Sequence, residues 1–354
     1  MTTPRVLLPE KAKLLVRLPN WLGDVILCTP ALAALKKARP SCELTALVKP
    51  GLQDAVRTLP GVARVATVDG TTLKATRRQA SALERERFDA ALIFPKGFRE
   101  ALLARLAAIP VRAGLDTDHR AFLLTHPVSF TEEDWHLHHA RQFAKVLSPF
   151  GVEACEEPLS FPLSPEDVAE AERLVLDAGL GGKRFAVFHV GASKPPRAWH
   201  AERFGAVGKA LLESSGLAPV LIGGPGDAGA HARFRVECPN AVDLAGKTTL
   251  RSMAAVIARA SLFIGNDSGP MHVAAAVGVP VVAIFGPGAP HKTEPYVPKE
   301  RFRVIHAALP CSPCRQSFWK DCRPSVAGKP PCLEAVHTEA VISACAALAT
   351  CGSC

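Results

Sequence analysis

Short apolar runs alternate with stretches of helical periodicity through the first half of the chain. Three runs have the length and aliphatic content of buried strands: residues 13–18, 43–48 and 89–94. Apolar positions recur at helical spacing over 25–38 and 101–108. Pro30 is expected in an early turn of the first helix or at a kink in it. Strands and helices that alternate in this way are typical of a doubly wound α/β domain.

A second series of the same kind follows residues 151–165, which are rich in Pro, Glu and Ser and show no clear periodicity. We interpret this stretch as a linker. Ser164 and Pro165 suit an N-cap and a first helical position, so a helix is predicted over 165–178. Apolar runs at 185–190 and 219–222 predict further strands. We therefore expect two domains, residues 1–160 and 161–354.

The most informative stretch is residues 261–287, which predict a strand, a polar loop, a helix and a second strand. The loop lies at the carboxyl end of one strand and at the amino end of a helix, where α/β proteins bind anions. A nucleotide diphosphate with its sugar fits such a loop. His272 could instead be a packed helix residue. The candidate ligand-binding residues are Asn266, Asp267, Ser268, Gly269, Pro270 and His272.

Three other loops follow predicted strands and carry candidate chemistry. Asp24, after Asn20 and Gly23, could be a general base or a carboxylate that stabilises the start of a helix. The loop with Ser193, Lys194 and Arg197 could bind phosphate, or its cations could be solvated. Asp227 closes a glycine-rich turn and could accept hydrogen bonds from sugar hydroxyls. The alternative is a carboxylate that only stabilises the turn.

Composition narrows the class of partner. The net charge is +9, yet the basic residues are scattered and the chain has a single Tyr, which disfavours nucleic acid and favours a phosphorylated or lipid-surface partner. A merely solubilising charge is the alternative. No apolar run approaches the roughly 20 residues of a membrane span, and the N-terminus does not resemble a signal peptide. We expect a cytoplasmic protein.

Seven of the eleven cysteines lie from Cys311 onward. Cys311, Cys314, Cys322 and Cys332 form a C-x2-C-x7-C-x9-C pattern whose first pair has chelate spacing, which suggests a structural zinc site. Reduced thiols and disulfides are the alternatives. A second cluster, His136, His138 and His139, lacks evident further ligands, and we interpret it as structural or surface residues.

Several of these motifs together resemble the ADP-heptose:lipopolysaccharide heptosyltransferase family (glycosyltransferase family 9), and most closely its heptosyltransferase II branch. The similarity runs through residues 17–24 and 29–32, residues 191–193 with Trp199 and Phe204, and residues 266–276 with 278–280. The resemblance implies a GT-B fold with two Rossmann-like domains facing across a cleft. Residues 1–160 would bind the acceptor, and residues 161–354, with the cysteine-rich tail, the ADP-sugar donor.

The resemblance also implies a reaction. An inverting enzyme of this family moves L-glycero-D-manno-heptose from ADP to the inner core of lipopolysaccharide, at the inner face of the cytoplasmic membrane, and needs no cofactor for catalysis. Asp24 would be the base, and Asp267, Ser268, Gly269 and His272 would hold the donor. Arg197 stands where the family usually has lysine, and Asp227 where glutamate is common.

The acceptor side is less specific. Lys96 and Arg99 are candidates for acceptor phosphate or carboxylate contacts, with a solvated loop as the alternative, and Asn20 and Gly23 are further acceptor-side candidates. Alternative functions are a transferase or epimerase for another nucleotide-sugar and a non-catalytic nucleotide-sugar-binding protein.

Overall fold

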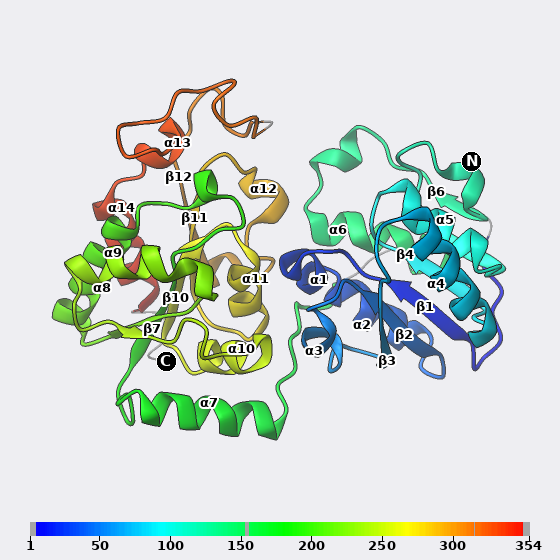
Figure 1. The fold of residues 1–354 in the computed structure, drawn as a ribbon, viewed down its shortest axis with the longest axis horizontal. Coiled ribbons are helices and arrows are strands. Elements are labelled where there is room, and N and C mark those ends of the chain that lie inside the picture. The colour runs from blue at the N-terminus through cyan, green and yellow to red at the C-terminus, as the bar shows by residue number, and fades with distance from the viewer. Residues whose placement is uncertain (1–4, 153–155, 315, 350–354) are drawn as a thin grey trace. The chain divides into compact units, whose positions relative to one another are not determined.

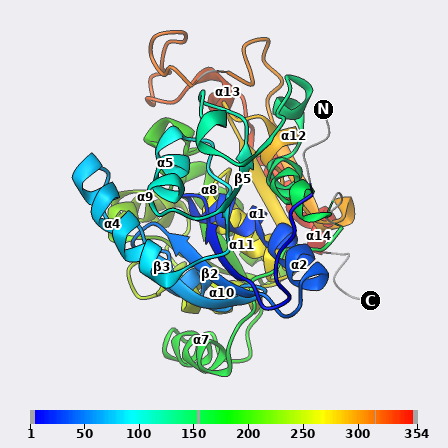
Figure 2. The same cartoon turned by 90° about the vertical axis from the view of Figure 1, so that its right-hand side faces the viewer.

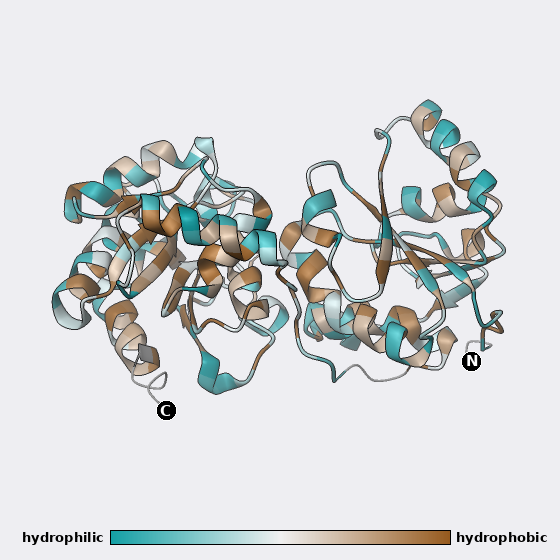
Figure 3. Cartoon of the chain, turned by 90° about the horizontal axis from the view of Figure 1, so that it is seen from below, coloured by the Kyte–Doolittle hydropathy of each residue, from teal (hydrophilic) through white to brown (hydrophobic). Residues whose placement is uncertain are grey.

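The computed structural model describes residues 5–152, 156–314 and 316–349, and the chain divides into two compact units, Met1–Pro162 and Leu163–Cys354. Figure 1 labels the elements of both units. In each unit, hydrophobic strand segments lie inside and the hydrophilic positions gather on the outer faces of helices, as Figure 3 shows. Three residues of the predicted linker, 153–155, lie outside the described residues.

Unit 1 is built on a six-stranded, wholly parallel sheet in the order β3-β2-β1-β4-β5-β6. Its strands are β1 (Lys13–Arg17), β2 (Glu43–Val48), β3 (Val62–Thr67), β4 (Ala90–Ile93), β5 (Val111–Leu115) and β6 (His126–Val128). Its α-helices are α1 (Leu22–Leu27), α2 (Thr29–Ala38), α3 (Gln53–Val56), α4 (Leu73–Glu86), α5 (Phe98–Leu106) and α6 (His139–Ala144). Three 3₁₀ segments complete it: Ala121–Leu123, Glu133–His136 and Lys145–Phe150.

Unit 2 has a second parallel six-stranded sheet, in the order β12-β11-β10-β7-β8-β9. Its strands are β7 (Phe185–His189), β8 (Ala218–Leu221), β9 (Val242–Asp243), β10 (Leu262–Asn266), β11 (Val281–Phe285) and β12 (Phe302–His306). Its α-helices are α7 (Pro165–Asp177), α8 (Ala201–Ser215), α9 (Ala228–Glu237), α10 (Leu250–Ala258), α11 (Gly269–Ala276), α12 (Pro290–Thr293), α13 (Pro331–Glu334) and α14 (Thr338–Ala349). Its 3₁₀ segments are Pro195–Arg197, Pro225–Asp227 and Lys299–Arg301.

The two sheets have the same topology. In each, the first strand of the unit pairs with the second on one side and with the fourth on the other, so the strand order reverses between β1 and β4 and again between β7 and β10. Ligands of open α/β sheets bind outside the carboxyl ends of the strands at such a switch point. The topology therefore directs attention to four loops: those after β1, β4, β7 and β10.

The core of unit 2 shows why the strands read as continuous apolar runs. β7, β10 and β11 are buried along their whole length, because helices cover both faces of a parallel sheet. Aromatic rings fill one face, with Phe188 edge-on to Phe234 and Trp199 edge-on to Phe204. The N-cap predicted at Ser164 is present, and it forms a capping box with Asp167. α7 packs against α10, below which it lies in Figure 2.

The predicted helix 25–38 is two helices that meet at Cys28. Pro30 has no N–H to donate to the Ile26 carbonyl four residues earlier, and the Thr29 hydroxyl donates to that carbonyl instead, at 2.7 Å. Pro30 therefore sits in the first turn of α2, and α1 is a separate six-residue helix.

Candidate active site

The loop after β7 and the loop after β10 are tied together by one buried amide. Asn266 ends β10 with no exposed surface, and its Nδ2 donates to the carbonyls of Val190 and Gly191 at 3.0 and 3.1 Å. Its Oδ1 accepts the backbone N–H of Trp199 at 2.9 Å. Asn266 is among the predicted ligand-binding residues, but its polar atoms serve the protein backbone.

Beyond this brace, Arg197 and Asp267 meet as an ion pair. Nη2 of Arg197 lies 2.5 Å from Oδ2 of Asp267, with side chains 23% and 12% exposed. The same nitrogen also reaches the Asp267 carbonyl at 3.3 Å. A β-carbon at Gly288 would lie 2.7 Å from Oδ2, so a side chain there would displace the carboxylate. The structure thus brings together two predicted donor-loop residues 70 positions apart.

Ser268 is the N-cap residue of α11, and its hydroxyl contacts a histidine that the sequence analysis missed. The Ser268 hydroxyl lies 3.1 Å from Nδ1 of His189, the buried last residue of β7. Burial lowers the pKa of His189 to about 4, against the opposing charge of Asp227, so the imidazole is neutral at neutral pH. The sequence did contain a sign of this residue, because His189 ends an otherwise apolar strand two residues before Gly191.

Gly269 and Pro270 are the first two residues of α11, and His272, one turn in, is only 4% exposed. Ser193 and Lys194 are exposed in the loop after β7. The amino end of α11 and this loop therefore flank the Arg197–Asp267 pair within unit 2.

Asp227 lies against the loops after both β7 and β8. Its Oδ2 accepts the backbone N–H of Gly224 at 2.9 Å. A β-carbon at Gly191 would lie 2.2 Å from Oδ1, and one at Gly223 would lie 2.5 Å from Oδ2. Two glycines therefore make the space for this carboxylate beside the loops after β7 and β8.

In unit 1, Asp24 stands in the first turn of α1 and faces a second histidine that the sequence analysis set aside. Nδ1 of His139, on α6, lies 3.4 Å from Oδ1 of Asp24, and the side chains are 31% and 29% exposed. His139, interpreted from the sequence as a structural or surface residue, reaches Asp24 because α6 packs against α1.

The rest of the loop after β1 is held by Arg17. Its Nη2 donates to Oδ1 of Asn20 at 2.5 Å and lies 3.6 Å from Glu100. Arg17 is 3% exposed; burial lowers its pKa to about 10, and Glu100 opposes that shift. Gly23 is buried inside α1. Asn20 is therefore a fixed part of the loop framework.

Lys96 and Arg99, the predicted acceptor cations, are both engaged within unit 1. Nζ of Lys96 lies 2.6 Å from Oε1 of Gln142 and over the rings of Phe130 and Trp135, at 4.6 and 4.1 Å from their centroids. Arg99 donates to the Gly70 carbonyl. The Lys96 ammonium is therefore not simply solvated, because it lies against two aromatic rings and bonds to Gln142.

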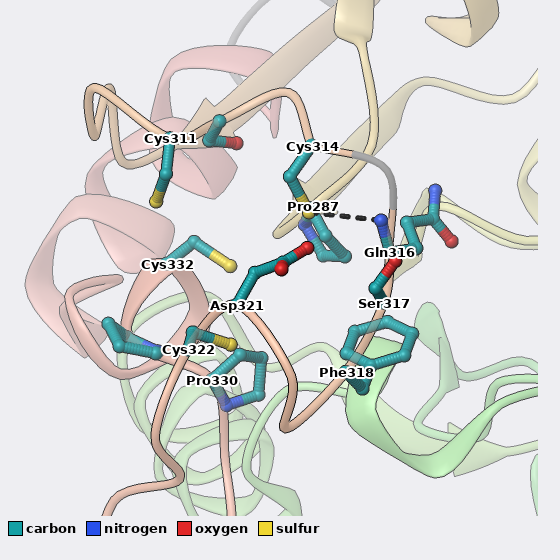
Figure 4. A pocket seen from close by; sticks show the side chains of 12 residues that line it. Pro287, Cys311, Cys314, Gln316, Ser317, Phe318, Asp321, Cys322, Pro330 and Cys332 are labelled. Atoms are coloured by element: carbon teal, nitrogen blue, oxygen red, sulfur yellow. Dashed lines mark hydrogen bonds between the residues drawn. The ribbon is translucent and has the colours of Figure 1, made fainter.

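The four cysteines of the predicted zinc site line one pocket, drawn in Figure 4, together with Pro287 and Asp321. They do not form the predicted site. Among the described residues, no group of three or more His, Cys, Asp or Glu side chains is placed to hold a metal ion. The zinc prediction is therefore not supported.

Comparisons with known proteins give a consistent result. A sequence model of glycosyltransferase family 9 (heptosyltransferase) matches residues 76–320. Lipopolysaccharide heptosyltransferase 2 of Salmonella typhimurium is 28% identical over 82% of this chain and 87% of its own length. Within the described part of the chain, none of the helices has the length and apolar character required to cross a bilayer.

Solved structures agree with the fold class. A glycosyltransferase family 9 protein from Veillonella parvula superposes with a TM-score of 0.81 at 25% identity, covering 96% of this chain and 97% of its own. Escherichia coli ADP-heptose lipopolysaccharide heptosyltransferase II gives a TM-score of 0.79 at 22% identity, covering 97% and 100%. The predicted α/β, GT-B class with two Rossmann-like sheets is confirmed.

Proposed function

The chain belongs to glycosyltransferase family 9, and from this we propose that it transfers L-glycero-D-manno-heptose from ADP-heptose to the heptosylated inner core of lipopolysaccharide. Curated relatives bear the name lipopolysaccharide heptosyltransferase 2. The observation that carries the proposal is the Arg197–Asp267 pair beside the amino end of α11, at the point where the strand order of unit 2 reverses.

Unit 2 is the proposed donor unit. Backbone N–H groups at the start of α11 and the Arg197 guanidinium suit a diphosphate, because helix N-termini and arginine both bind phosphate oxygens. Lys194, Ser193 and Gly269 are further proposed donor contacts. Asp227 is proposed to accept hydrogen bonds from donor hydroxyls. Asn266 and Pro270 shape the loop, and His272 stays a proposed donor-side residue.

Unit 1 is the proposed acceptor unit, with Asp24 as the general base. The attacking hydroxyl of the acceptor loses its proton to Asp24 while the sugar–diphosphate bond breaks through an oxocarbenium-like state. Negative charge then gathers on the leaving ADP, where Arg197 and the α11 N–H groups stabilise it. This scheme uses no cofactor. Asn20, Gly23, Lys96 and Arg99 are proposed to frame the acceptor side.

Because the proposed acceptor is a lipid, we propose that the protein works at the inner face of the cytoplasmic membrane. A net charge of +9 favours a peripheral encounter with anionic headgroups.

The test is ADP release from ADP-heptose with a heptosylated Kdo-lipid A acceptor. Asp24→Asn should lower kcat by about 10²–10⁴-fold, the usual contribution of a general base. Asp177→Asn, an exposed carboxylate at the end of α7, is the matched control and should behave as wild type. An Asp24→Asn variant with undiminished kcat would remove Asp24 from the mechanism.

Donor identity needs a separate measurement. Calorimetric titration of wild type with ADP-, UDP- and GDP-sugars should show preference for the adenosine donor. Preference for a uridine donor would favour the other nucleotide-sugar enzymes instead. Tight ADP-heptose binding without turnover on any core acceptor would favour a non-catalytic binding protein.

A further inference from the structure

We propose that His139 is a positioning residue for the Asp24 carboxylate, an inference that rests on the proposed role of Asp24 as base. The two side chains are 115 positions apart in sequence, and Nδ1 of His139 lies 3.4 Å from Oδ1 of Asp24. Within the described residues, His139 is the one side chain that hydrogen-bonds to or pairs with Asp24. The contact joins α6 to the helix that carries the base.

Contacts of other α6 side chains with neighbouring segments of unit 1 fix the position of α6, and with it the position of His139. Nε2 of Gln142 donates a hydrogen bond to the Leu137 carbonyl at 2.8 Å, and Oε1 of Gln142 accepts one from the Lys96 ammonium at 2.6 Å. One turn after His139, the ring of Phe143 packs edge-on against Phe94, with centroids 6.1 Å apart. The imidazole itself lies edge-on to Phe143 at 6.2 Å. One short helix thus connects a predicted acceptor-side cation with the proposed base.

The hydrogen bond between His139 and Asp24 would fix the orientation of the carboxylate, which matters for a base. If Nδ1–H donates to Oδ1, the carboxylate cannot rotate freely and Oδ2 is left for the acceptor hydroxyl. A distance of 3.4 Å is long, and catalytic hydrogen bonds of free enzymes commonly shorten when substrate binds. Misplacement of a catalytic group by about 1 Å can cost about 10²-fold in rate.

A second group, Cys28, lies near Asp24 at the end of α1. Burial, and to a lesser degree Asp24, hold the pKa of this thiol well above its ordinary value, so it stays neutral. The contact with His139 is therefore the one that the variants below address.

Three variants test the kinetic part. His139→Phe keeps a ring without the donor and should lower kcat about 10–100-fold, with KM for ADP-heptose within about threefold of wild type. His139→Asn places an amide N–H near the former Nδ1, so it should restore most of the lost kcat. His136→Asn, an exposed histidine three residues earlier, is the control.

Two kinetic outcomes would overturn the inference. A His139→Phe enzyme with wild-type kcat would show that the contact does nothing. A His139→Asn enzyme as impaired as Asp24→Asn would show that the imidazole itself accepts the proton.

A spectroscopic measurement tests the contact whether or not heptose transfer is observed. Imidazole nitrogen shifts in ¹⁵N-histidine-labelled protein at alkaline pH report which nitrogen carries the proton. We expect His139 to favour the Nδ1–H tautomer in wild type and to lose that preference in Asp24→Ala. The same tautomer in both proteins would overturn the inference, while a wild-type enzyme without transfer activity would instead overturn the proposed function.

Discussion

Each unit holds the loops at its switch point in place with buried polar side chains, but the two units use different chemical groups. Unit 2 uses the neutral amide of Asn266, whose donor and acceptor atoms are all satisfied by backbone groups. Unit 1 uses two buried guanidinium groups, Arg17 and Arg120. Within the described residues, Nε of Arg17 and Nη2 of Arg120 have no hydrogen-bond partner.

The difference has an energetic meaning. Burial lowers the pKa of both arginines to about 10, because a guanidinium charge is costly to hold away from water. The amide brace of unit 2 carries no such cost. We therefore expect the neutral brace to be the more stabilising one.

The largest effect is expected when the neutral brace is removed. Asn266→Ala leaves two carbonyls and one N–H buried without partners, so the free energy of unfolding of unit 2 should fall by about 4 kcal/mol. Urea unfolding, with hydrogen exchange resolved by peptide, would measure the loss and locate it. Asn240→Ala, at an exposed turn residue, is the matched control. A loss confined to unit 1, or below about 1 kcal/mol, would contradict this account.

Removal of a charged brace should cost less. Arg120 donates to the carbonyls of Pro95, Gly97 and Leu115 at 2.6, 2.8 and 3.0 Å, and Arg120→Met leaves these groups unpaired. The same change relieves the desolvation of a buried charge, so unit 1 should lose about 3 kcal/mol. The measurement is the same, with exposed Arg77→Met as control. A larger loss than that of Asn266→Ala would reverse the comparison.

The smallest effect concerns pH and the buried imidazole of unit 2. His189 has a pKa of about 4 in the folded protein against 6.5 ordinarily, so the unfolded chain binds more protons between these values and stability falls as pH falls. From pH 7 to pH 5 the contribution is about 2 kcal/mol. His189→Gln should remove that part of the pH dependence of unfolding. Equal pH dependence in both proteins would mean that His189 is not held neutral.

Sequence reasoning predicted the strands that are buried along most of their length, because such strands read as continuous apolar runs. It did not predict the partly exposed strands β3, β5, β6, β9 and β12. The strand predicted at 43–48 matches β2 residue for residue, and the second strand predicted within residues 261–287 is β11. Asn266 was expected in a loop, because an isolated polar residue after an apolar run resembles a turn. It instead ends β10, since its partners come from the loop after β7.

The partners of site residues were the part that sequence could not supply. The approach of His139 to Asp24, and the Phe130 and Trp135 rings around Lys96, depend on how distant segments pack. Local periodicity carries no information on such pairs. The residues proposed to bind the donor could be singled out from the sequence because strand, loop and helix are contiguous there.

The Thr29 hydroxyl, described above as the replacement for the missing Pro30 N–H, has a mechanical consequence. The same oxygen accepts the backbone N–H of Ser160 at 3.0 Å, so it ties the segment that leads out of unit 1 to the joint between α1 and α2. Four residues further on, that segment reaches the N-cap of α7. Tension along this tether would act first at Pro162, whose carbonyl accepts the Thr58 hydroxyl at 2.9 Å, and then at the end of the six-residue helix that carries Asp24.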